Sequence, residues 1–252
     1  NRTLSIGRSF APCLMIVAID AGNTRIKWGL FDGERWIARG AIPTIQAVQL
    51  AEVAKEWPVE AKIIACNVAG KAVEVTINAA LPPDRPPVLW LRSSAEACGV
   101  RNLYTEPESL GADRWAAMIG ARRLNPGNCL VVCAGTATTV DWIDTEGYFR
   151  GGIILPGFEL MRTSLAQNTV QLPLADGLFC REPRNTRDAI FSGCLSAQVG
   201  AIERAFSMSS DPTALCLMTG GAIEVMAPHV RIPFRLEENL ILEGLVCFAT
   251  SN

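Results

Sequence analysis

Apolar residues along this chain form two kinds of pattern, short continuous runs and longer stretches in which they recur every three or four positions. The continuous runs are typical of buried strands and stand at residues 16–19, 63–66, 88–91 and 129–133. The longer stretches predict helices at residues 41–57, 71–81, 108–124 and 185–206. Because strands and helices alternate in this way, the chain is expected to have an α/β fold.

One strand pattern occurs twice. Residues 15–31, MIVAIDAGNTRIKWGLF, run apolar, turn small and polar at residues 20–24, and resume strand-like alternation, which predicts an antiparallel pair. Residues 129–144, CLVVCAGTATTVDWID, repeat this order of apolar run, Ala-Gly, small polar turn and apolar strand with a tryptophan. Gly22 and Gly135 lie 113 positions apart (135 − 22), close to half the chain. The repeat predicts two similar lobes, although each hairpin taken alone also fits a plain structural turn.

The two turns suit phosphate binding. A glycine lets the backbone approach a ligand closely, and exposed N–H groups with Thr or Asn side chains offer donors to phosphate oxygens. An acid accompanies each turn, Asp20 the first and Asp141 the second, and these carboxylates could hold cations that offset phosphate charge. Neither a Walker A motif nor a GxGxxG motif occurs in the chain. The pattern favours nucleotide chemistry by another route.

Composition narrows the partners. The 252 residues carry 23 basic and 25 acidic side chains, so there is no basic surplus for a polynucleotide, and we expect no nucleic-acid partner. Nine cysteines without a CxxC pair, together with one histidine, offer no zinc ligand set and fit reduced thiols in a cytoplasm. No apolar stretch approaches the ~20 residues that span a bilayer, so we expect no membrane association.

The amino-terminal end admits two interpretations. Arg2 and Arg8, followed by FAPCLMIVAI, resemble the charged and apolar parts of a signal peptide. Pro12 interrupts that run, and cleavage just after it would cut into the turn at Asp20. We therefore expect residues 1–14 to be a tail or a cloning remnant that precedes the folded domain.

Several short motifs follow one another in a specific order. The first hairpin resembles the first phosphate motif of the acetate and sugar kinase, heat-shock chaperone and actin superfamily. GADRW, GTATTVD, GGIILPG, NT..AI..G and TGGA together resemble the type III pantothenate kinases, a family that includes the Bvg accessory factors. The resemblance implies two similar lobes of the actin-like ATPase (ribonuclease H-like) type with a cleft between them. Residues 15–109 would form the N-terminal lobe and residues 110–252 the C-terminal lobe.

The resemblance also implies which residues meet ATP. Two glycine turns approach the phosphates, and a later Gly-Gly pair lies near the adenosine. The residues concerned are Asp20, Gly22, Asn23 and Thr24 in the first turn, Gly135, Thr136 and Thr138 in the second, and Gly220 and Gly221 in the pair. Asp20 helps to organise magnesium, and Asp141 matches the acid that binds a monovalent cation, potassium or ammonium. One position departs from the family, which often has an acid two residues before the second turn, where this chain has Cys133.

The acceptor side of the site falls in YTEPESLGADR and in one later threonine. The resemblance assigns pantothenate binding to Tyr104, Gly111, Arg114 and, from the partner subunit, Thr186, and catalysis to Asp113. The residues support Asp113 independently, because phosphorylating an alcohol needs a base and the one histidine lies outside every glycine turn. Asp113 begins a helix beside small residues, where Arg114 can counter an anionic carboxylate. The alternative is that Asp113 only stabilises the helix start through the dipole.

The activity that the resemblance implies is phosphoryl transfer. The γ-phosphoryl of ATP would pass to the primary hydroxyl of pantothenate to give 4'-phosphopantothenate, the first step of coenzyme A biosynthesis. One alternative is an ATP-binding regulatory protein of the Bvg accessory factor kind, without kinase turnover. The other is a kinase for a different small hydroxylated acid.

A homodimer with a shared active site is also expected. In residues 185–206 small side chains recur every four positions and form one helix face, which comprises Ala189, Gly193, Ala197 and Ala201. Such a face lets another helix approach closely, and a two-fold interface on it would carry Thr186 toward the neighbour's Asp113. The alternative is that this face packs against its own lobe.

Overall fold

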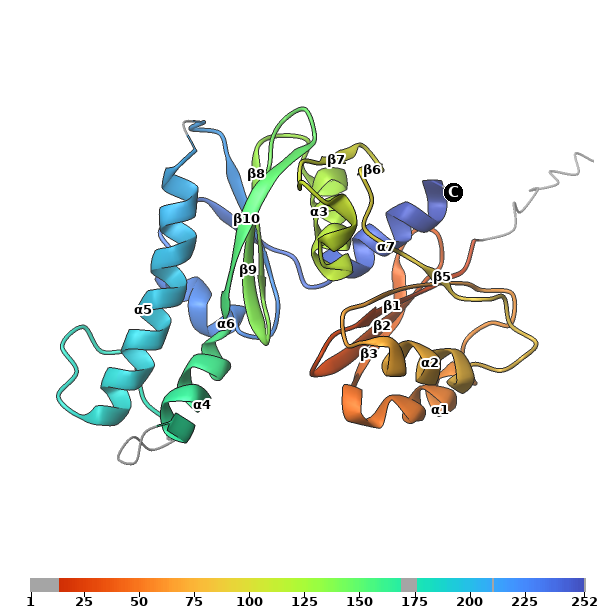
Figure 1. Cartoon of the computed structure of the whole chain (residues 1–252), viewed down its shortest axis with the longest axis horizontal. Coiled ribbons are helices and arrows are strands. Elements are labelled where there is room, and N and C mark those ends of the chain that lie inside the picture. The colour runs from red at the N-terminus through yellow and green to blue at the C-terminus, as the bar shows by residue number, and fades with distance from the viewer. Residues whose placement is uncertain (1–13, 169–175, 210, 252) are drawn as a thin grey trace, which may run out of the picture.

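Two β-sheets with helices between and outside them make up the fold in the computed structural model (Figure 1). The structure describes residues 14–168, 176–209 and 211–251. Of the segment expected to be a tail, residues 1–13 lie outside the described residues. Strands and helices alternate along the described chain, so the α/β prediction is confirmed.

The first sheet has five strands in the order β3-β2-β1-β4-β5. Its strands are β1 (Ile16–Ala21), β2 (Arg25–Phe31), β3 (Trp36–Pro43), β4 (Lys62–Asn67) and β5 (Leu89–Trp90). Strands β1 to β3 form an antiparallel meander, and β4 lies parallel to β1 on its other side. The expected antiparallel pair around residues 20–24 is thus confirmed as β1 and β2.

The second sheet repeats this plan. Its seven strands run in the order β12-β11-β8-β9-β10-β7-β6. They are β6 (Glu96–Ala97), β7 (Val100–Asn102), β8 (Cys129–Ala134), β9 (Ala137–Ile143), β10 (Tyr148–Pro156), β11 (Leu215–Thr219) and β12 (Phe234–Leu236). The strands from β10 to β12 reproduce the order of the first sheet, with an antiparallel meander beside two parallel strands. The internal repeat therefore extends from the hairpin to a whole sheet.

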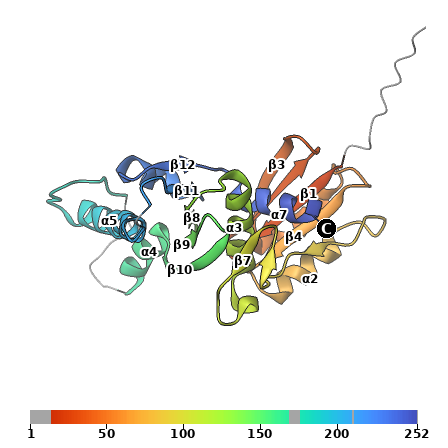
Figure 2. The ribbon, with the colours of Figure 1, turned by 90° about the horizontal axis from the view of Figure 1, so that it is seen from above.

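Helices divide the apolar residues among three cores. Helices α3 (Ala112–Leu124) and α7 (Leu240–Ser251) lie between the two sheets (Figure 2) and share one core with the facing strands. The outer face of the first sheet is covered by η1 (Thr44–Gln49), α1 (Leu50–Ala54) and α2 (Lys71–Ala80). The outer face of the second is covered by α4 (Phe158–Asn168), α5 (Thr186–Ser207), α6 (Ile223–Met226) and η3 (Ala227–His229). The short helix η2 (Pro107–Ser109) leads into α3.

Helices α3 and α7 cross at a pair of glycines. A Cβ on Gly120 would overlap the carbonyl oxygen of Leu240, and one on Gly244 would overlap the carbonyl oxygen of Ala116. Both helices need glycine here because each backbone occupies the space of the other's side chain. Since α7 also packs against β1 and β4, this crossing joins the two sheets and sets their relative position.

The structure differs from the expected elements in one region. The helix expected at residues 41–57 is wrong at its start, because β3 continues through Pro43. A 3₁₀ helix follows, with a non-helical Gln46, and only Leu50–Ala54 are α-helical. Proline has no N–H to donate, so strand pairing ends at Pro43 and the chain turns there. The lobe boundary at residue 109 stays a proposal; β6 and β7 already belong to the second sheet, and α7 packs against the first.

Candidate active site

The first glycine turn joins β1 to β2 and is held by hydrogen bonds from Thr44. The backbone N–H of Gly22 donates to the carbonyl of Arg25 at 3.1 Å, which closes the turn. The Thr44 hydroxyl donates to the Gly22 carbonyl at 2.6 Å, and the Thr44 N–H donates to the Thr24 carbonyl at 3.0 Å. Asn23 and Thr24 remain exposed. Sequence reasoning missed Thr44, because the segment that contains it was expected to be helical.

Asp20 lies at the end of β1 with its side chain toward α3, and its carboxyl is 6% exposed. The Cys66 thiol donates to its Oδ1 across 3.6 Å, which is a weak contact. Burial and, to a smaller extent, the charge on Asp113 raise the pKa of Asp20 to about 6, and Lys27 only partly offsets them. Because little positive charge surrounds this buried carboxyl, a divalent cation bound to it would stabilise its ionised form.

Asp113 begins α3, where the predicted helix start is confirmed within a few residues. Its Oδ1 accepts the N–H of Arg114 at 2.8 Å. A Cβ on Gly111 would come within 2.7 Å of the same Oδ1, so glycine leaves the carboxylate its space. Burial raises the pKa of Asp113, and the Arg114 N–H and charge oppose that rise. His229 stacks on Phe179 with ring centroids 4.3 Å apart, outside this group.

Arg114 is committed to two partners. Its Nε donates to Oδ2 of Asp141 at 3.1 Å, and its Nη2 donates to Oδ1 of the same carboxylate. Its Nη1 donates to the Tyr104 hydroxyl at 2.9 Å. The side chains of this ion pair are 6% and 2% exposed. Burial is the largest single influence and opposes the charge on Arg114, but the hydrogen bonds to Asp141 and Tyr104, together with the charge of Asp141, outweigh it and raise the pKa of the guanidinium.

Gly152 lies directly against this ion pair. A Cβ on Gly152 would overlap Oδ1 of Asp141 and come within 3.0 Å of Nη2 of Arg114. The pair therefore fills the space beside β10, where GGIILPG forms most of the strand. The default interpretation of GGIILPG as a hairpin strand holds, and its second glycine, Gly152, also makes room for the buried charge pair.

The second glycine turn joins β8 to β9 and meets the first turn. The N–H of Gly135 donates to the Ala137 carbonyl at 3.0 Å, and the N–H of Gly157 donates to the Thr136 carbonyl at 2.9 Å. The hydroxyl oxygens of Thr24 and Thr136 lie 2.7 Å apart and share a hydrogen bond. Two turns separated by half the chain are thus brought together, each with exposed small polar residues.

Strand alternation separates two neighbouring threonines of the second turn. The side chain of Thr138 is fully buried on the α5 side of β9, and its Oγ1 has no partner among the described residues. Thr139 faces the other side, together with Asp141 and Cys133, and it lowers the pKa of both groups, although its own Oγ1 also has no hydrogen-bond partner among the described residues. The assignment of Thr138 to the phosphate clamp stays a prediction, and in this structure its hydroxyl is buried. The period of two along a strand is the signal that places Thr139, rather than Thr138, on the same face as Asp141.

Cys133 stands in the second lobe where Asp20 stands in the first, two residues before the glycine. Burial and the charges of Asp141 and Asp113 raise the pKa of its thiol. The second strand end therefore carries a neutral group where the first carries a carboxyl.

Gly220 and Gly221 follow β11 and lie beside the second turn. Gly220 has a φ of 112°, and a Cβ there would overlap the backbone of Ala134. The N–H of Ala222 donates to the Ala134 carbonyl at 3.2 Å. A Cβ on Gly221 would meet nothing within 4 Å, so its backbone is open to a ligand.

Thr186 is the one predicted residue that stands apart from the others. It is exposed at the start of α5, where Asn185 caps the helix by accepting from the Asp188 N–H at 3.0 Å. An apolar groove runs from Thr186 between α4 and α5, and its walls include Leu160, Leu165 and Gly193. Within one chain this groove belongs to the outer side of the second sheet, away from α3 (Figure 1).

Comparison with known proteins assigns the chain to a family. The family model described as Type III pantothenate kinase matches residues 16–208. The chain belongs to the type III pantothenate kinase family. A type III pantothenate kinase from Aromatoleum aromaticum is 51% identical over 236 residues, which cover 93% of this chain and 98% of the relative.

Solved structures agree on the fold. A Baf family transcriptional activator from Campylobacter jejuni is 20% identical with a TM-score of 0.65, covering 94% of this chain and 98% of that one. A 2-dehydro-3-deoxygalactonokinase protein from Sinorhizobium meliloti is 15% identical with a TM-score of 0.63, covering 94% and 96%. The prediction of a two-lobed fold of the actin-like ATPase and sugar kinase type is confirmed. Within the described part of this kinase-family chain, no helix is long and apolar enough to cross a bilayer.

Proposed function

We propose that this protein transfers the γ-phosphoryl of ATP to the primary hydroxyl of pantothenate, giving 4'-phosphopantothenate for coenzyme A biosynthesis. Family membership supports the reaction, and one structural observation supports its site. Asp20 and Asp113, from different lobes, interact electrostatically beside the point where the two glycine turns meet. Phosphoryl transfer needs this combination of phosphate-binding turns, a cation-holding acid and a base.

Asp113 is the proposed base. Because its pKa is raised, the Asp113 carboxylate is more basic than that of an ordinary aspartate, which favours accepting a proton from an alcohol. Gly111 leaves its Oδ1 accessible, and the Arg114 N–H orients it. As the pantothenate oxygen attacks the γ-phosphorus, its proton passes to the Asp113 carboxylate, and ADP leaves with the broken bond's electrons.

Asp20 is the proposed magnesium ligand. Its buried carboxyl offers the hard oxygen atoms that Mg²⁺ prefers, and its raised pKa marks a charge that lacks compensation. Magnesium there would offset the charge on the ATP phosphates. Gly22 and Gly135 use their N–H groups to close the turns, and their lack of side chains lets a phosphate approach the backbone; the hydroxyls of Thr24 and Thr136 are the donors proposed for phosphate oxygens.

A monovalent cation, potassium or ammonium, at Asp141 belongs to the same proposal. Both oxygens of Asp141 already accept hydrogen bonds from Arg114, which supplies the positive charge expected of the ion. A cation there must share the carboxylate with a guanidinium, so we expect its contribution to be small. Because Asp141 already pairs with Arg114, we propose that Arg114 contributes to substrate binding indirectly, by positioning the Tyr104 hydroxyl to which it donates.

The assay that tests this function follows ADP release from Mg·ATP by the purified chain with and without pantothenate. Release that depends on pantothenate supports the kinase. ATP binding without pantothenate-dependent ADP would contradict it and favour the regulatory alternative. Turnover with another hydroxy acid, but not with pantothenate, would favour a different acceptor.

We further propose a homodimer that shares its active sites. The small face of α5 does not pack against its own lobe, because Ala189, Gly193 and Ala197 are exposed and a Cβ on Gly193 would meet nothing within 4 Å. The adjoining groove is flanked by Leu160 and Leu165, which are 45% and 38% exposed. A second copy docked on this face would bury both and bring its Thr186 toward the first chain's Asp113.

Complementation tests the shared site. One chain carries Asp113→Asn and the other carries Thr186→Trp, and each is inactive alone. In mixed dimers one site receives both changes and the other neither, so about a quarter of all sites should work if chains pair at random. No recovery, with mixed dimers shown to be present by mass spectrometry, would mean that each chain builds its site alone.

A cytoplasmic location is part of the proposal. Every cysteine that the structure describes is free, which suits a reducing compartment. ATP and the proposed acceptor are metabolites of the same compartment.

A further inference from the structure

A surface pocket lies beside the proposed acceptor site. It has a volume of about 450 Å³ and is lined by Leu103, Tyr104, Thr105, Glu106, Ser109, Arg150 and Gly151. The Tyr104 hydroxyl in its wall accepts a hydrogen bond from Arg114, and the lining segment reaches Asp113 only four residues after Ser109 (113 − 109). The pocket is thus contiguous with the residues proposed to hold the acceptor, and the proposed function assigns it no role.

The acceptor has an anionic end that the residues described so far leave without a positive charge. Pantothenate carries its primary hydroxyl and its carboxylate at opposite ends. Arg114 does not supply the charge, because the Asp141 carboxylate neutralises it within a buried pair. A second cationic side chain near Tyr104 would bind that carboxylate through charge-assisted hydrogen bonds, which are stronger than those from neutral donors.

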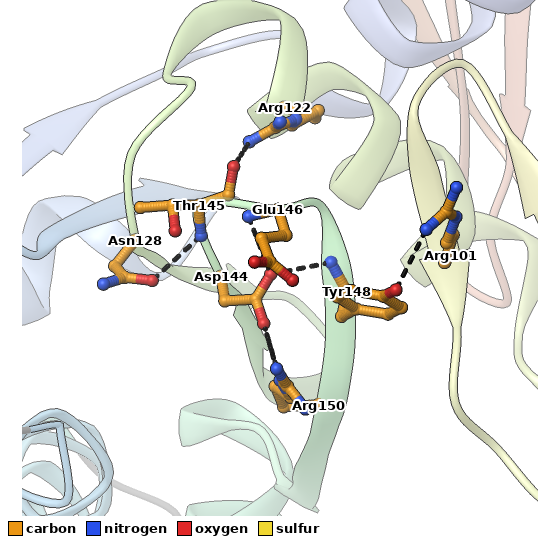
Figure 3. A network of polar contacts seen from close by, with 8 residues as sticks. All are labelled: Arg101, Arg122, Asn128, Asp144, Thr145, Glu146, Tyr148 and Arg150. Carbon is orange, nitrogen blue, oxygen red and sulfur yellow. Dashed lines mark hydrogen bonds and ion pairs between the residues drawn. The ribbon is translucent and has the colours of Figure 1, made fainter.

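Arg150 is the basic side chain among the seven lining residues, and it is held in place. Its Nε donates to Oδ2 of Asp144 at 2.6 Å, and its Nη2 lies 2.6 Å from the same oxygen (Figure 3). Asp144 is itself fixed by the backbone N–H groups of Glu146 and Tyr148, at 3.0 and 2.9 Å. The side chain of Arg150 is still 57% exposed, and Nη1 carries two further N–H donors. An arginine held on one edge presents its other edge to a ligand.

A β-bulge explains why Arg150 reaches this pocket. The register between β9 and β10 shifts between Phe149 and Gly151, and Gly151 has a φ of 113°. Phe149 stays buried under the Tyr104 ring, with centroids 5.2 Å apart. A bulge re-aims the side chain it displaces, and here that side chain is Arg150.

We propose that Arg150 binds the carboxylate end of the acceptor and so determines the preference for an acid over a neutral analogue. This inference rests on the proposed function. Glu106 also lines the pocket, and its charge limits the affinity for an anion. Arg150 is thus a specificity residue, whereas Asp113 acts on the other end of the same molecule.

Arg101 provides a matched control. Its guanidinium carbon lies 5.4 Å from the centroid of the Tyr148 ring, and that of Arg150 lies 5.1 Å from it. The two side chains are 52% and 57% exposed, and each has a carboxylate partner. Arg101 does not line the pocket. Loss of charge or of stacking on Tyr148 is therefore common to Arg101→Gln and Arg150→Gln, and only the second removes a donor from the pocket.

The test compares pantothenate with pantothenyl alcohol, in which a hydroxymethyl group replaces the carboxylate and the primary hydroxyl is kept. Arg150→Gln should raise KM for pantothenate about tenfold or more, the usual effect of losing one charge-assisted hydrogen bond, with kcat nearly unchanged. KM for the alcohol should stay within about twofold, and Arg101→Gln should change neither. Glu106→Gln should lower KM for pantothenate.

Equal changes in KM for the two acceptors, no change for either, or the same selectivity loss in Arg101→Gln would overturn the role of Arg150. Calorimetric binding of pantothenate to the wild-type chain separates this failure from that of the proposed function. Wild-type protein that neither binds pantothenate nor turns over either acceptor would overturn both.

Discussion

The two glycine turns share one backbone plan but differ in how they carry charge. The first ends its strand with Asp20, a buried carboxyl whose pKa is raised to about 6. The second has Cys133 at the equivalent place, and its acid stands further along, as Asp141 on β9, bound by Arg114. One lobe therefore leaves a charge to be compensated by a ligand, and the other compensates its charge internally. We propose that both turns bind phosphate and that the divalent cation binds at the first, because only the first strand ends in a carboxyl where the second has Cys133.

Asp113, which begins α3 between the two lobes, should give the largest effect. Asp113→Asn should lower kcat by ~10²–10⁴, the usual contribution of a general base, while the helix start is retained. Steady-state ADP release measures kcat, and circular dichroism checks the fold. Glu108→Gln, in the exposed 3₁₀ helix just before α3, should leave kcat unchanged and serves as the control. Near-native turnover by the Asp113 variant would mean that it only lines the site.

The compensated acid of the second lobe should behave as a structural charge. Asp141→Asn should lower the free energy of unfolding by about 3–5 kcal/mol, because it leaves Arg114 buried without its partner. The exposed pair of Arg101 and Glu96, 3.5 Å apart, gives the contrast, since Glu96→Gln should cost less than about 1 kcal/mol. Urea unfolding at neutral pH measures both. Similarly small losses for the two variants would show that the buried ion pair contributes no more to stability than the exposed one.

Asp20, the uncompensated acid of the first lobe, should have the opposite effect on stability, so that removing its charge raises the free energy of unfolding. The folded-state pKa of Asp20 is about 6, against an ordinary value of 3.8, so the stability it contributes below pH 3.8 is lost as the pH rises through 6. Asp20→Asn should therefore stabilise the nucleotide-free protein at pH 8 by up to about 3 kcal/mol, and hardly at all at pH 4. Unfolding by urea without magnesium measures this.

The same variant should bind Mg·ATP at least about tenfold more weakly, because the cation loses a carboxylate ligand. Calorimetric titration with Mg·ATP checks the affinity. A variant that is less stable at pH 8 and keeps its affinity for Mg·ATP would contradict the contrast between the lobes.

Much of this contrast was predictable from the pattern of residues, and the remainder depends on tertiary contacts. The turns at Gly22 and Gly135 and the start of α3 follow from local signals, namely apolar runs that end in glycine and an acid at a helix start. The missed strand β3 overlaps the expected helix only at residues 41–43, where the apolar spacing also fits a helix. The pairing of Arg114 with Asp141 joins residues 27 positions apart, and no local pattern contains it.

Thr138 and Thr139 illustrate the limit at the level of single side chains. The GTATTVD motif does not distinguish its threonines, whereas the strand does, because alternate residues of β9 face opposite sides of the sheet. The crossing of α3 and α7 was not predicted either, because the close approach at Gly120 and Gly244 depends on how the two sheets are placed.

The monovalent cation should have the smallest effect. If a monovalent cation binds at Asp141, activity at fixed magnesium should be lower in tetramethylammonium than in potassium. The difference is limited because Arg114 already neutralises that carboxylate. We expect less than about a threefold difference, mainly in KM for ATP, since the shift in charge is small. A tenfold loss would mean that the ion displaces Arg114 or binds elsewhere near the turns.

The structure of the product shows whether the phosphoryl group is transferred to one particular hydroxyl. Pantothenate has a primary and a secondary hydroxyl, and the purified chain is incubated with Mg·ATP and pantothenate until ADP release stops. Phosphorus–proton NMR correlation on the product should connect the phosphorus to the protons of the primary methylene group, and the Asp113→Asn chain should yield almost none of this product. A phosphate on the secondary hydroxyl, or unmodified pantothenate beside ADP formed by hydrolysis, would contradict the account.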